Sequence, residues 1–277
     1  ADQVAAAVPA LRSTLVVGEP GHHQRLDTGP AANDEPIGVP ERAASGDLAL
    51  FLVSGGTTGQ PKLVPRTHDD WSYSGRAMAE TIPYDSTTVT LVGLPIGHNW
   101  PLTHGMLATF HAGGTMVLAR TPDPVECFEL IARERVTDTG LVPGMALLWM
   151  DEAPYTDADL SSLRRLAIGG SKLDPELAQQ VEPALGVRLQ QMFGMAEGLI
   201  GFVRDNDPPE MTVLSQGRPL SPGDEIRVVD KADRDVPEGE VGELLARGPY
   251  TIRGYYRAPE HNRRSFTSDG YYRTGDL

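Results

Sequence analysis

A short stretch near the start of the chain holds residues suited to binding phosphate. After the apolar run Leu48–Val53, the chain reads Ser54, Gly55, Gly56, Thr57, Thr58 and Gly59, and Lys62 follows Pro61. Glycines let backbone N–H groups approach an anion, hydroxyls add donors, and a lysine adds a positive charge. The spacing is not that of a Walker loop, because Pro61 precedes the lysine. The stretch predicts a phosphate-binding loop after a short buried strand, with a small polar hairpin turn as the alternative.

Three other segments combine glycine with aromatic, charged or amide side chains. They are Gly97-His98-Asn99-Trp100, Gly169-Gly170-Ser171-Lys172 and Gln191-Met192-Phe193-Gly194-Met195-Ala196-Glu197. An aromatic ring such as that of Phe193 can lie against a purine, and the carboxylate of Glu197 is a hard oxygen ligand suited to Mg²⁺. The alternatives are a core phenylalanine, a surface glutamate and a plain strand-to-helix turn.

A fourth segment reads Tyr272-Arg273-Thr274-Gly275-Asp276. Its aspartate could accept hydrogen bonds from both hydroxyls of a ribose. An isolated Thr-Gly-Asp would instead be an ordinary turn.

Short apolar runs alternate with helical patterns through the middle of the chain. Strands are predicted over residues 88–94, 115–119, 137–142, 163–168 and 187–192. Helices are predicted between them, and Asp123-Pro124 and Asp174-Pro175 are typical helix starts. This order predicts an α/β fold in which a mainly parallel sheet is covered by helices, with ligands outside the carboxyl ends of the strands. The candidate segments fall at those ends.

The character of the sequence changes beyond Asp205. Short β-rich runs over residues 225–229, 241–247 and 250–256 are separated by turn residues, which predicts a small antiparallel unit. We therefore expect an α/β portion over residues 1–204 and a β-rich portion over residues 205–277. Before the phosphate loop, a helix near residues 1–12 and a strand at 14–17 precede a connecting segment.

Composition excludes several classes of protein. A formal charge of −14 over 277 residues argues against binding nucleic acid or an anionic membrane. The single Cys127 excludes an intramolecular disulfide and a cysteine-based zinc site. No apolar run approaches membrane-spanning length and no signal-peptide pattern is present, so the cytoplasm is the expected location.

The string from Ser54 to Lys62, continuing through Leu-Val-Pro-Arg-Thr-His-Asp-Asp70, resembles the phosphate loop of acyl-adenylate-forming enzymes. It is most similar to that of the stand-alone aryl-acid adenylating enzymes of the 2,3-dihydroxybenzoate–AMP ligase type. The resemblance implies ATP-dependent activation of a carboxylate, with this loop and Lys62 on the phosphates, Glu197 on Mg²⁺ and Asp276 on the ribose. Adenine would be bound by residues of the second and third segments: Gly169, Gly170, Ser171, Gln191, Met192, Phe193, Gly194 and Met195.

The resemblance also implies where the acid binds. His98 would lie beside the carboxylate and the α-phosphate as an orienting residue, and Asn99 would face the substituent of an aromatic ring. The rest of the acid pocket would be formed by Trp100, His104, Gly170, Ser171, Gly194, Met195 and Ile200. Salicylate, 2,3-dihydroxybenzoate or a heteroaromatic acid would fit a neutral asparagine. Two departures alter this pocket: Trp100 replaces a smaller aromatic residue, and His104 replaces a small residue in a segment one residue shorter than usual.

The product is expected to pass to the phosphopantetheine thiol of an aryl or peptidyl carrier protein, as in nonribosomal peptide or siderophore biosynthesis. Transfer to CoA is one alternative. A nucleotide-binding core without turnover is another, because the chain starts without methionine and ends one residue after Asp276. In enzymes of the resembling family a catalytic lysine, and an arginine that partners the ribose aspartate, would lie beyond Leu277.

Overall fold

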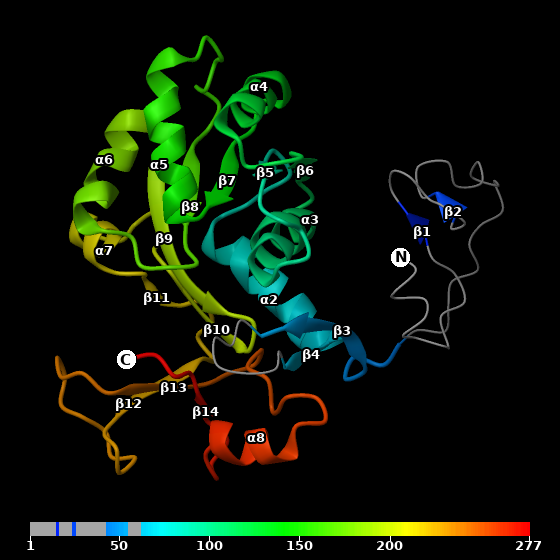
Figure 1. Cartoon of the computed structure of the whole chain (residues 1–277), viewed down its shortest axis with the longest axis vertical. Helices are drawn as coiled ribbons and strands as arrows, with labels where there is room; N and C mark the ends of the chain where they lie inside the picture. The colour runs from blue at the N-terminus through cyan, green and yellow to red at the C-terminus, as the bar shows by residue number, and fades with distance from the viewer. Residues whose placement is uncertain (1–14, 17–23, 26–42, 55–61) are drawn as a thin grey trace. The chain divides into compact units, whose positions relative to one another are not determined.

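The computed structural model of the chain describes residues 15–16, 24–25, 43–54 and 62–277 (Figure 1). The chain divides into two compact units, Ala1–Ala43 and Ala44–Leu277. In the first unit, strands β1 (Leu15–Val16) and β2 (Gln24–Arg25) pair in parallel. The helix predicted near residues 1–12 lies outside the described residues.

A seven-stranded sheet forms the body of the second unit, in the order β11-β10-β9-β8-β7-β5-β6. Five neighbouring strands are parallel, which confirms the predicted α/β class. They are β5 (Val89–Val92), β6 (Thr115–Leu118), β7 (Asp138–Leu141), β8 (Arg165–Ile168) and β9 (Arg188–Met195).

The other edge of this sheet is antiparallel and was not predicted. Strand β9 continues three residues past its predicted end and turns directly into β10 (Gly198–Phe202), which pairs with β11 (Arg218–Pro219). The segment Phe193–Met195 therefore lies within a strand, and Glu197 alone among the predicted binding residues sits in the turn.

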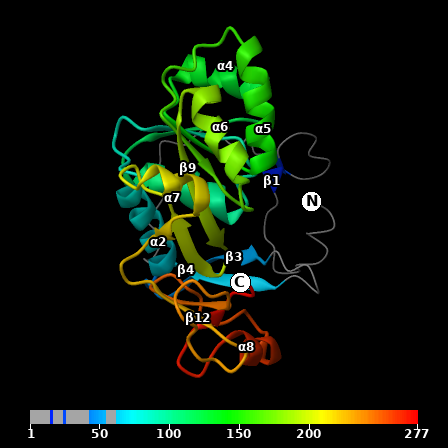
Figure 2. The same cartoon turned by 90° about the vertical axis from the view of Figure 1, so that its left-hand side faces the viewer.

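Helices cover both faces of the sheet (Figures 1 and 2). Alternation along β8 shows the two layers, since Leu166 and Ile168 pack in one apolar cluster and Ala167 in the other. The first face carries α4 (Pro124–Glu134), α5 (Pro143–Glu152) and α6 (Pro175–Leu185), with α7 (Pro209–Leu214) beside α6. The second face carries α2 (His68–Thr81), the π-helical segment η1 (Pro101–Leu107) and α3 (Ala108–His111).

The two Asp-Pro pairs begin helices as predicted. Asp123 accepts hydrogen bonds from two backbone N–H groups at the start of α4, and Asp174 does the same for α6. One of the helices predicted between the strands, near residues 102–111, is irregular, because it begins with the π-helical η1. There Gly105 lies so close to β5 that a Cβ would be 2.4 Å from Val92 Cγ2. None of the helices formed by the described residues is long and apolar enough to cross a membrane.

A separate three-stranded antiparallel sheet contains β12 (Glu225–Val229), β13 (Glu243–Arg247) and β14 (Tyr272–Arg273), with α8 (Pro259–Ser265) beside it in sequence. The strand predicted over 250–256 is absent from it. Those residues use their backbone donors elsewhere: Ile252 N donates to the carbonyl of Glu197, and Tyr256 N donates to that of Leu63.

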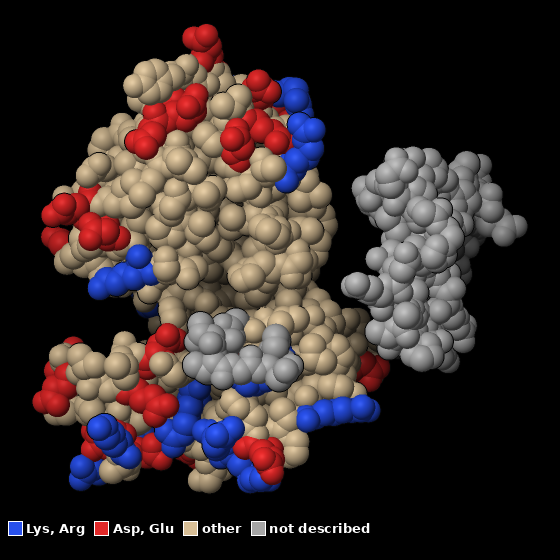
Figure 3. Space-filling model, viewed as in Figure 1, with Lys and Arg blue, Asp and Glu red and all other residues tan. Residues whose placement is uncertain are grey.

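Side chains of both charge signs gather around this part of the molecule (Figure 3). A boundary between portions near residue 205 stays a prediction.

Strand β3 (Leu48–Val53) forms an antiparallel hairpin with β4 (Leu63–Thr67), and the prediction that β3 is buried is wrong. Leu52 is 5% exposed, whereas Val53 is 62% exposed. A two-stranded sheet has only one face on the core, here the cluster that contains Leu52, Val64 and Tyr255. The alternate residues of β3 therefore face away from that cluster.

A buried arginine joins this hairpin to the main sheet. The guanidinium of Arg66, 2% exposed, donates to Asp70 Oδ1 at 2.9 Å and to the carbonyl of Ala196 at 2.9 Å. The second oxygen of Asp70 accepts from the backbone N–H of Thr67, which closes a capping box at the start of α2. One arginine thus joins the start of a helix to the turn that contains Glu197.

We expect Asp70→Ala to lower the free energy of unfolding by about 3 kcal/mol, because it leaves the charge of Arg66 buried without its partner. Asp69→Ala is the matched control, since Asp69 is an exposed acidic residue in the same helical turn. Its loss should cost about 0.5 kcal/mol, the size of a helix-dipole interaction. Urea unfolding of both variants measures the difference, and equal losses would show that the ion pair is not what stabilises this junction.

Candidate active site

Three of the predicted segments meet at the carboxyl ends of the parallel strands. His98 and Asn99 follow β5, Gly169 follows β8, and Glu197 follows β9. The Asn99 side-chain amide donates to the carbonyl of Met195 at 3.3 Å, which joins the first segment to the third. A Cβ at Gly169 would lie 2.4 Å from Met192 Cγ, so the second segment also contacts the third. The sheet therefore brings together residues that are separated by up to a hundred positions in sequence.

The phosphate-loop residues Gly55, Gly56, Thr57, Thr58 and Gly59 lie outside the described residues, but both ends of the loop are described. The backbone N–H of Ser54 donates to the carbonyl of Lys62 at 2.9 Å, and the N–H of Lys62 donates to Ser54 Oγ at 3.2 Å. These two bonds hold the ends of the β3–β4 connection together.

Glu197 is 8% exposed and has one side-chain partner among the described residues. Tyr255 donates its hydroxyl to Glu197 Oε1 at 2.8 Å, and Tyr272 OH lies 2.9 Å from Tyr255 OH. Burial and the carboxylate raise the pKa of Tyr255 far above its usual range, and burial raises that of Tyr272 to about 12. The Lys62 ammonium lies 5.3 Å from the centre of the Tyr255 ring. The lysine and the carboxylate predicted to bind phosphate and metal therefore share one neighbour.

The surroundings of Glu197 suit Mg²⁺ held mainly by phosphates. Within the described part of the chain, no group of three or more His, Cys, Asp or Glu side chains could bind a metal by itself. Mg²⁺ in nucleotide sites is commonly bound through one or two carboxylates plus phosphates and water. A single buried carboxylate with one oxygen already hydrogen-bonded fits that pattern.

A pocket of about 350 Å³ brings Phe193 and Asp276 together. It lies between β10 and β11 on one side and β12 and β13 on the other. The turn that carries Asp276 is fixed to β13, because Leu244 N donates to the Asp276 carbonyl at 2.9 Å. Gln216, which sequence reasoning missed, also lines the pocket and donates to the carbonyl of Met192 at 3.0 Å. In the sequence, Gln216 could have been noticed only through the glycine that follows it; Gly217 has a φ of +83° in the structure.

Two residues predicted to bind adenine are occupied elsewhere. The side-chain amide of Gln191 donates to the carbonyls of Thr212 and Val213 in α7, at 2.7 and 3.0 Å. Met192 is 4% exposed and packs in the apolar cluster on the α2 face. Neither residue lines the pocket that contains Phe193 and Asp276.

The two glycines after β8 are required by the protein itself. Gly169 leaves no room for a side chain because of Met192, and Gly170 has a φ of +85°, which L side chains rarely adopt. A strand-to-helix turn and a place beside adenine, both predicted for this segment, are compatible. Gly170 and Ser171 are exposed at the carboxyl end of β8, and Gly194 is exposed near the end of β9.

The predicted acid-pocket residues Trp100, His104 and Ile200 pack around a small cavity or beside it. Trp100 and His104 are 7% and 3% exposed and line a cavity of about 10 Å³. Trp100 lies so close to β7 that a Cβ at Gly140 would be 3.0 Å from its ring, and its indole N–H has no partner among the described residues. Ile200 belongs to the same apolar cluster as Trp100.

Polar partners fix the remaining acid-pocket residues. Tyr84 OH lies 3.3 Å from His104 Nε2, and burial lowers the pKa of His104 to about 4. Thr103 donates to Asn99 Oδ1 at 3.5 Å. His98 is exposed, and its Nδ1 accepts from the backbone N–H of Trp100 at 3.3 Å. This hydrogen bond from the main chain fixes the orientation of the His98 ring.

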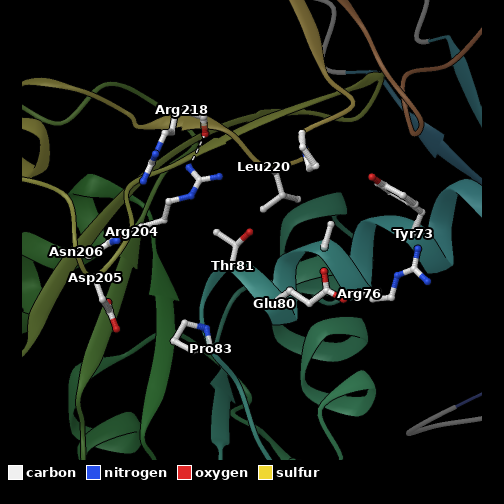
Figure 4. Close-up of a pocket in the computed structure, with 12 residues that line it drawn as sticks. Tyr73, Arg76, Glu80, Thr81, Pro83, Arg204, Asp205, Asn206, Arg218 and Leu220 are labelled. Carbon is white, nitrogen blue, oxygen red and sulfur yellow. Dashed lines mark hydrogen bonds between the residues drawn. The ribbon is translucent and has the colours of Figure 1, made fainter.

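A larger pocket of about 610 Å³ contains none of the predicted site residues (Figure 4). Two of its arginines already have polar partners. Arg204 donates to the carbonyls of Phe202, Arg218 and Pro219, and Arg218 pairs with Asp207 at 2.8 Å. We therefore place the candidate site at the strand ends and not in this pocket.

The sequence signature of the AMP-binding enzyme family matches residues 1–256. The chain belongs to this family. Pyochelin synthase PchD of Pseudomonas aeruginosa is 57% identical over 84% of the chain and 43% of that protein. The 2,3-dihydroxybenzoate-AMP ligase of Bacillus subtilis is 50% identical over 100% of the chain and 51% of the ligase.

A solved structure shows the same fold. The apo structure of MbtA from Mycobacterium smegmatis superposes with a TM-score of 0.90 and 45% identity, over 99% of this chain and 51% of that one. The chain therefore spans about half the length of the AMP-binding enzymes that it matches.

His104 should make stability depend on pH. Its pKa is about 4 in the folded protein against an ordinary value of 6.5, so only the unfolded chain takes up a proton as the pH falls between these values. The contribution of neutral His104 to the free energy of unfolding is therefore fully present above pH 6.5. It decreases below that pH, by about 2 kcal/mol at pH 5. His104→Gln should remove this part of the pH dependence in urea unfolding at pH 7.5 and 5. An unchanged slope in the variant would show that His104 is protonated in the folded protein.

Proposed function

We propose that the protein uses ATP to convert an aromatic carboxylic acid into its aryl adenylate, with release of pyrophosphate. The observation that carries this proposal is the meeting of the predicted nucleotide residues around one connected set of contacts. Phe193 and Asp276 share a pocket, and Tyr272, four residues before Asp276, is joined through Tyr255 to Glu197. The names of the relatives, a 2,3-dihydroxybenzoate-AMP ligase among them, support the same reaction.

In this reaction a carboxylate oxygen of the acid attacks the α-phosphorus of ATP, and the bond to the bridging oxygen of pyrophosphate breaks. An ionised aromatic acid needs no general base, so catalysis consists of positioning and charge neutralisation. Lys62 would neutralise phosphate oxygens, and His98 would orient the acid beside the α-phosphate. Glu197 would hold Mg²⁺, which supplies positive charge to the phosphates.

A role for Glu197 in metal binding gives a sharp expectation. Glu197→Gln should reduce the affinity for ATP in the presence of Mg²⁺ by about tenfold, because it removes one anionic ligand at constant shape. Affinity for AMP without metal should stay within about twofold. Glu176→Gln, at an exposed position in α6, is the matched control. Calorimetry measures both ligands, and an equal loss for ATP and AMP would contradict the metal assignment.

The acid pocket is built from neutral groups. Asn99 is held by Met195 and Thr103, and the buried His104 is neutral at physiological pH. The side chain of Asn99 offers no negative charge to the α-ammonium of an amino acid, whereas an amide can meet a hydroxyl or a ring nitrogen. We therefore infer an aromatic acid with such a substituent next to its carboxylate, salicylate and 2,3-dihydroxybenzoate being the simplest.

Acid-dependent exchange of pyrophosphate into ATP tests this choice, with a panel of aryl acids and α-amino acids. Aryl acids should be preferred, and Asn99→Asp should lower their use by about tenfold or more, because a charge would face a hydroxyl or ring of the acid. Asn206→Asp, at the exposed pocket of Figure 4, is the control. A preference for amino acids, or indifference to Asn99→Asp, would remove the basis for an aromatic substrate.

We further propose that the aryl group passes to the phosphopantetheine thiol of a carrier protein in the cytoplasm. Support comes from the relatives, one of which, from Mycobacterium tuberculosis, is named a salicyl-AMP ligase and salicyl-S-ArCP synthetase. Transfer to CoA is the competing reaction. Supplying a carrier protein and CoA separately to preformed aryl adenylate distinguishes them, since only the true acceptor should yield a thioester.

A further inference from the structure

Tyr255 occupies a central position that the sequence did not mark. It lies in the irregular segment after β13, and its side chain is 5% exposed. Its backbone is clamped by Asn262 of α8: Tyr255 N donates to Asn262 Oδ1 at 2.9 Å, and Asn262 Nδ2 donates to the Tyr255 carbonyl at 3.0 Å. Gly254 precedes it at a φ of +157°, where a Cβ would lie 3.0 Å from Asn262 Nδ2. The position of the ring is therefore fixed from its own main chain.

The hydroxyl of Tyr255 lies between two other side chains. Tyr255 donates its single hydroxyl proton to Glu197 Oε1, at 2.8 Å. Tyr272 must then donate to Tyr255, at 2.9 Å. The two phenols form a directed chain from β14, the strand that leads into Asp276, to the carboxylate in the turn after β9. No other described side chain bonds Glu197.

The ring of Tyr255 contacts two further groups. The ammonium of Lys62, at the end of the phosphate loop, lies 5.3 Å from the ring centre, and the His261 ring packs against its edge at 5.0 Å. A cation at this distance from an aromatic face is attracted by the ring. One residue thus contacts both the carboxylate and the lysine that are predicted to meet the phosphates.

We propose that Tyr255 is a positioning residue for Mg²⁺·ATP, which holds Glu197 Oε1 so that the other carboxylate oxygen is presented to the metal. The inference rests on the proposed function of Glu197. A carboxylate that is hydrogen-bonded through one oxygen has a fixed orientation, and loss of such a supporting bond typically lowers metal affinity by about 10- to 100-fold. Tyr272 bonds the hydroxyl of Tyr255 and thereby connects Glu197 Oε1 to the segment that carries Asp276.

The test compares Tyr255→Phe with Tyr256→Phe. Phenylalanine keeps the ring beside Lys62 and removes only the hydroxyl, and Tyr256 is an adjacent, 38% exposed tyrosine that packs on Phe51. Calorimetry gives the affinity for ATP with and without Mg²⁺, and for AMP. Tyr255→Phe should reduce the gain in ATP affinity caused by Mg²⁺ by about tenfold and leave AMP within about twofold. Tyr256→Phe should change neither quantity.

A double-mutant cycle separates positioning from a loss of structure. In a Glu197→Gln background, Tyr255→Phe should have no further effect on the Mg²⁺-dependent gain, because the carboxylate that it orients is gone. An equal loss of AMP and Mg²⁺·ATP affinity, or an unchanged gain while the wild type shows one, would overturn the inference and leave the metal role of Glu197 intact. Absence of any gain in the wild type would overturn that role, and the inference with it.

Discussion

The guanidinium of Arg66 is the constraint on which the candidate site depends. It is a buried charge, and it is satisfied only if Asp70, Ser74 and the carbonyl of Ala196 stay in place together. Because an unpaired buried charge is costly, these three elements cannot move independently. The start of α2, the end of β4 and the turn at Ala196 are consequently one rigid junction. The carboxylate proposed to hold the metal is the next residue along.

Local signals in the sequence were enough to predict the parallel part of the sheet. Strands β5, β6 and β8 contain short apolar runs. Asp123 and Asp174 mark the starts of α4 and α6 through side-chain caps, which need no distant partner. The segment around Ile252 was wrongly predicted to be a strand, because its backbone bonds to remote residues, Glu197 among them. Strand β10 was missed although it pairs with its neighbour β9; its other partner, β11, is remote in sequence. The prediction that β3 is buried was wrong because a run of apolar residues does not reveal how many faces of its sheet are covered.

For the candidate site, the binding roles of the residues stay predictions, and the structure shows the contacts that each of them makes within the protein. Phe193 and Asp276 do meet in one pocket, whereas Gln191 supports α7 and Gly169 gives way to Met192. A motif contains both residues that line a pocket and residues that bond to neighbouring elements, and spacing alone does not separate the two kinds. Tyr255 went unnoticed because a buried hydroxyl has no sequence pattern of its own. Its importance comes only from the carboxylate that the fold places beside it.

The two departures in the acid pocket form a matched set with a third residue. The wide indole of Trp100 fits because the facing position on β7 is Gly140, where a Cβ would be 3.0 Å away. His104 fills the space beside it as a neutral ring, since burial there keeps its pKa near 4. Under the proposed function, neutral groups would surround the acid, and the charges of Lys62 and Glu197 would lie at the phosphate end. Such a separation would let the phosphates be neutralised without placing a charge against the aromatic ring, where it would be poorly solvated.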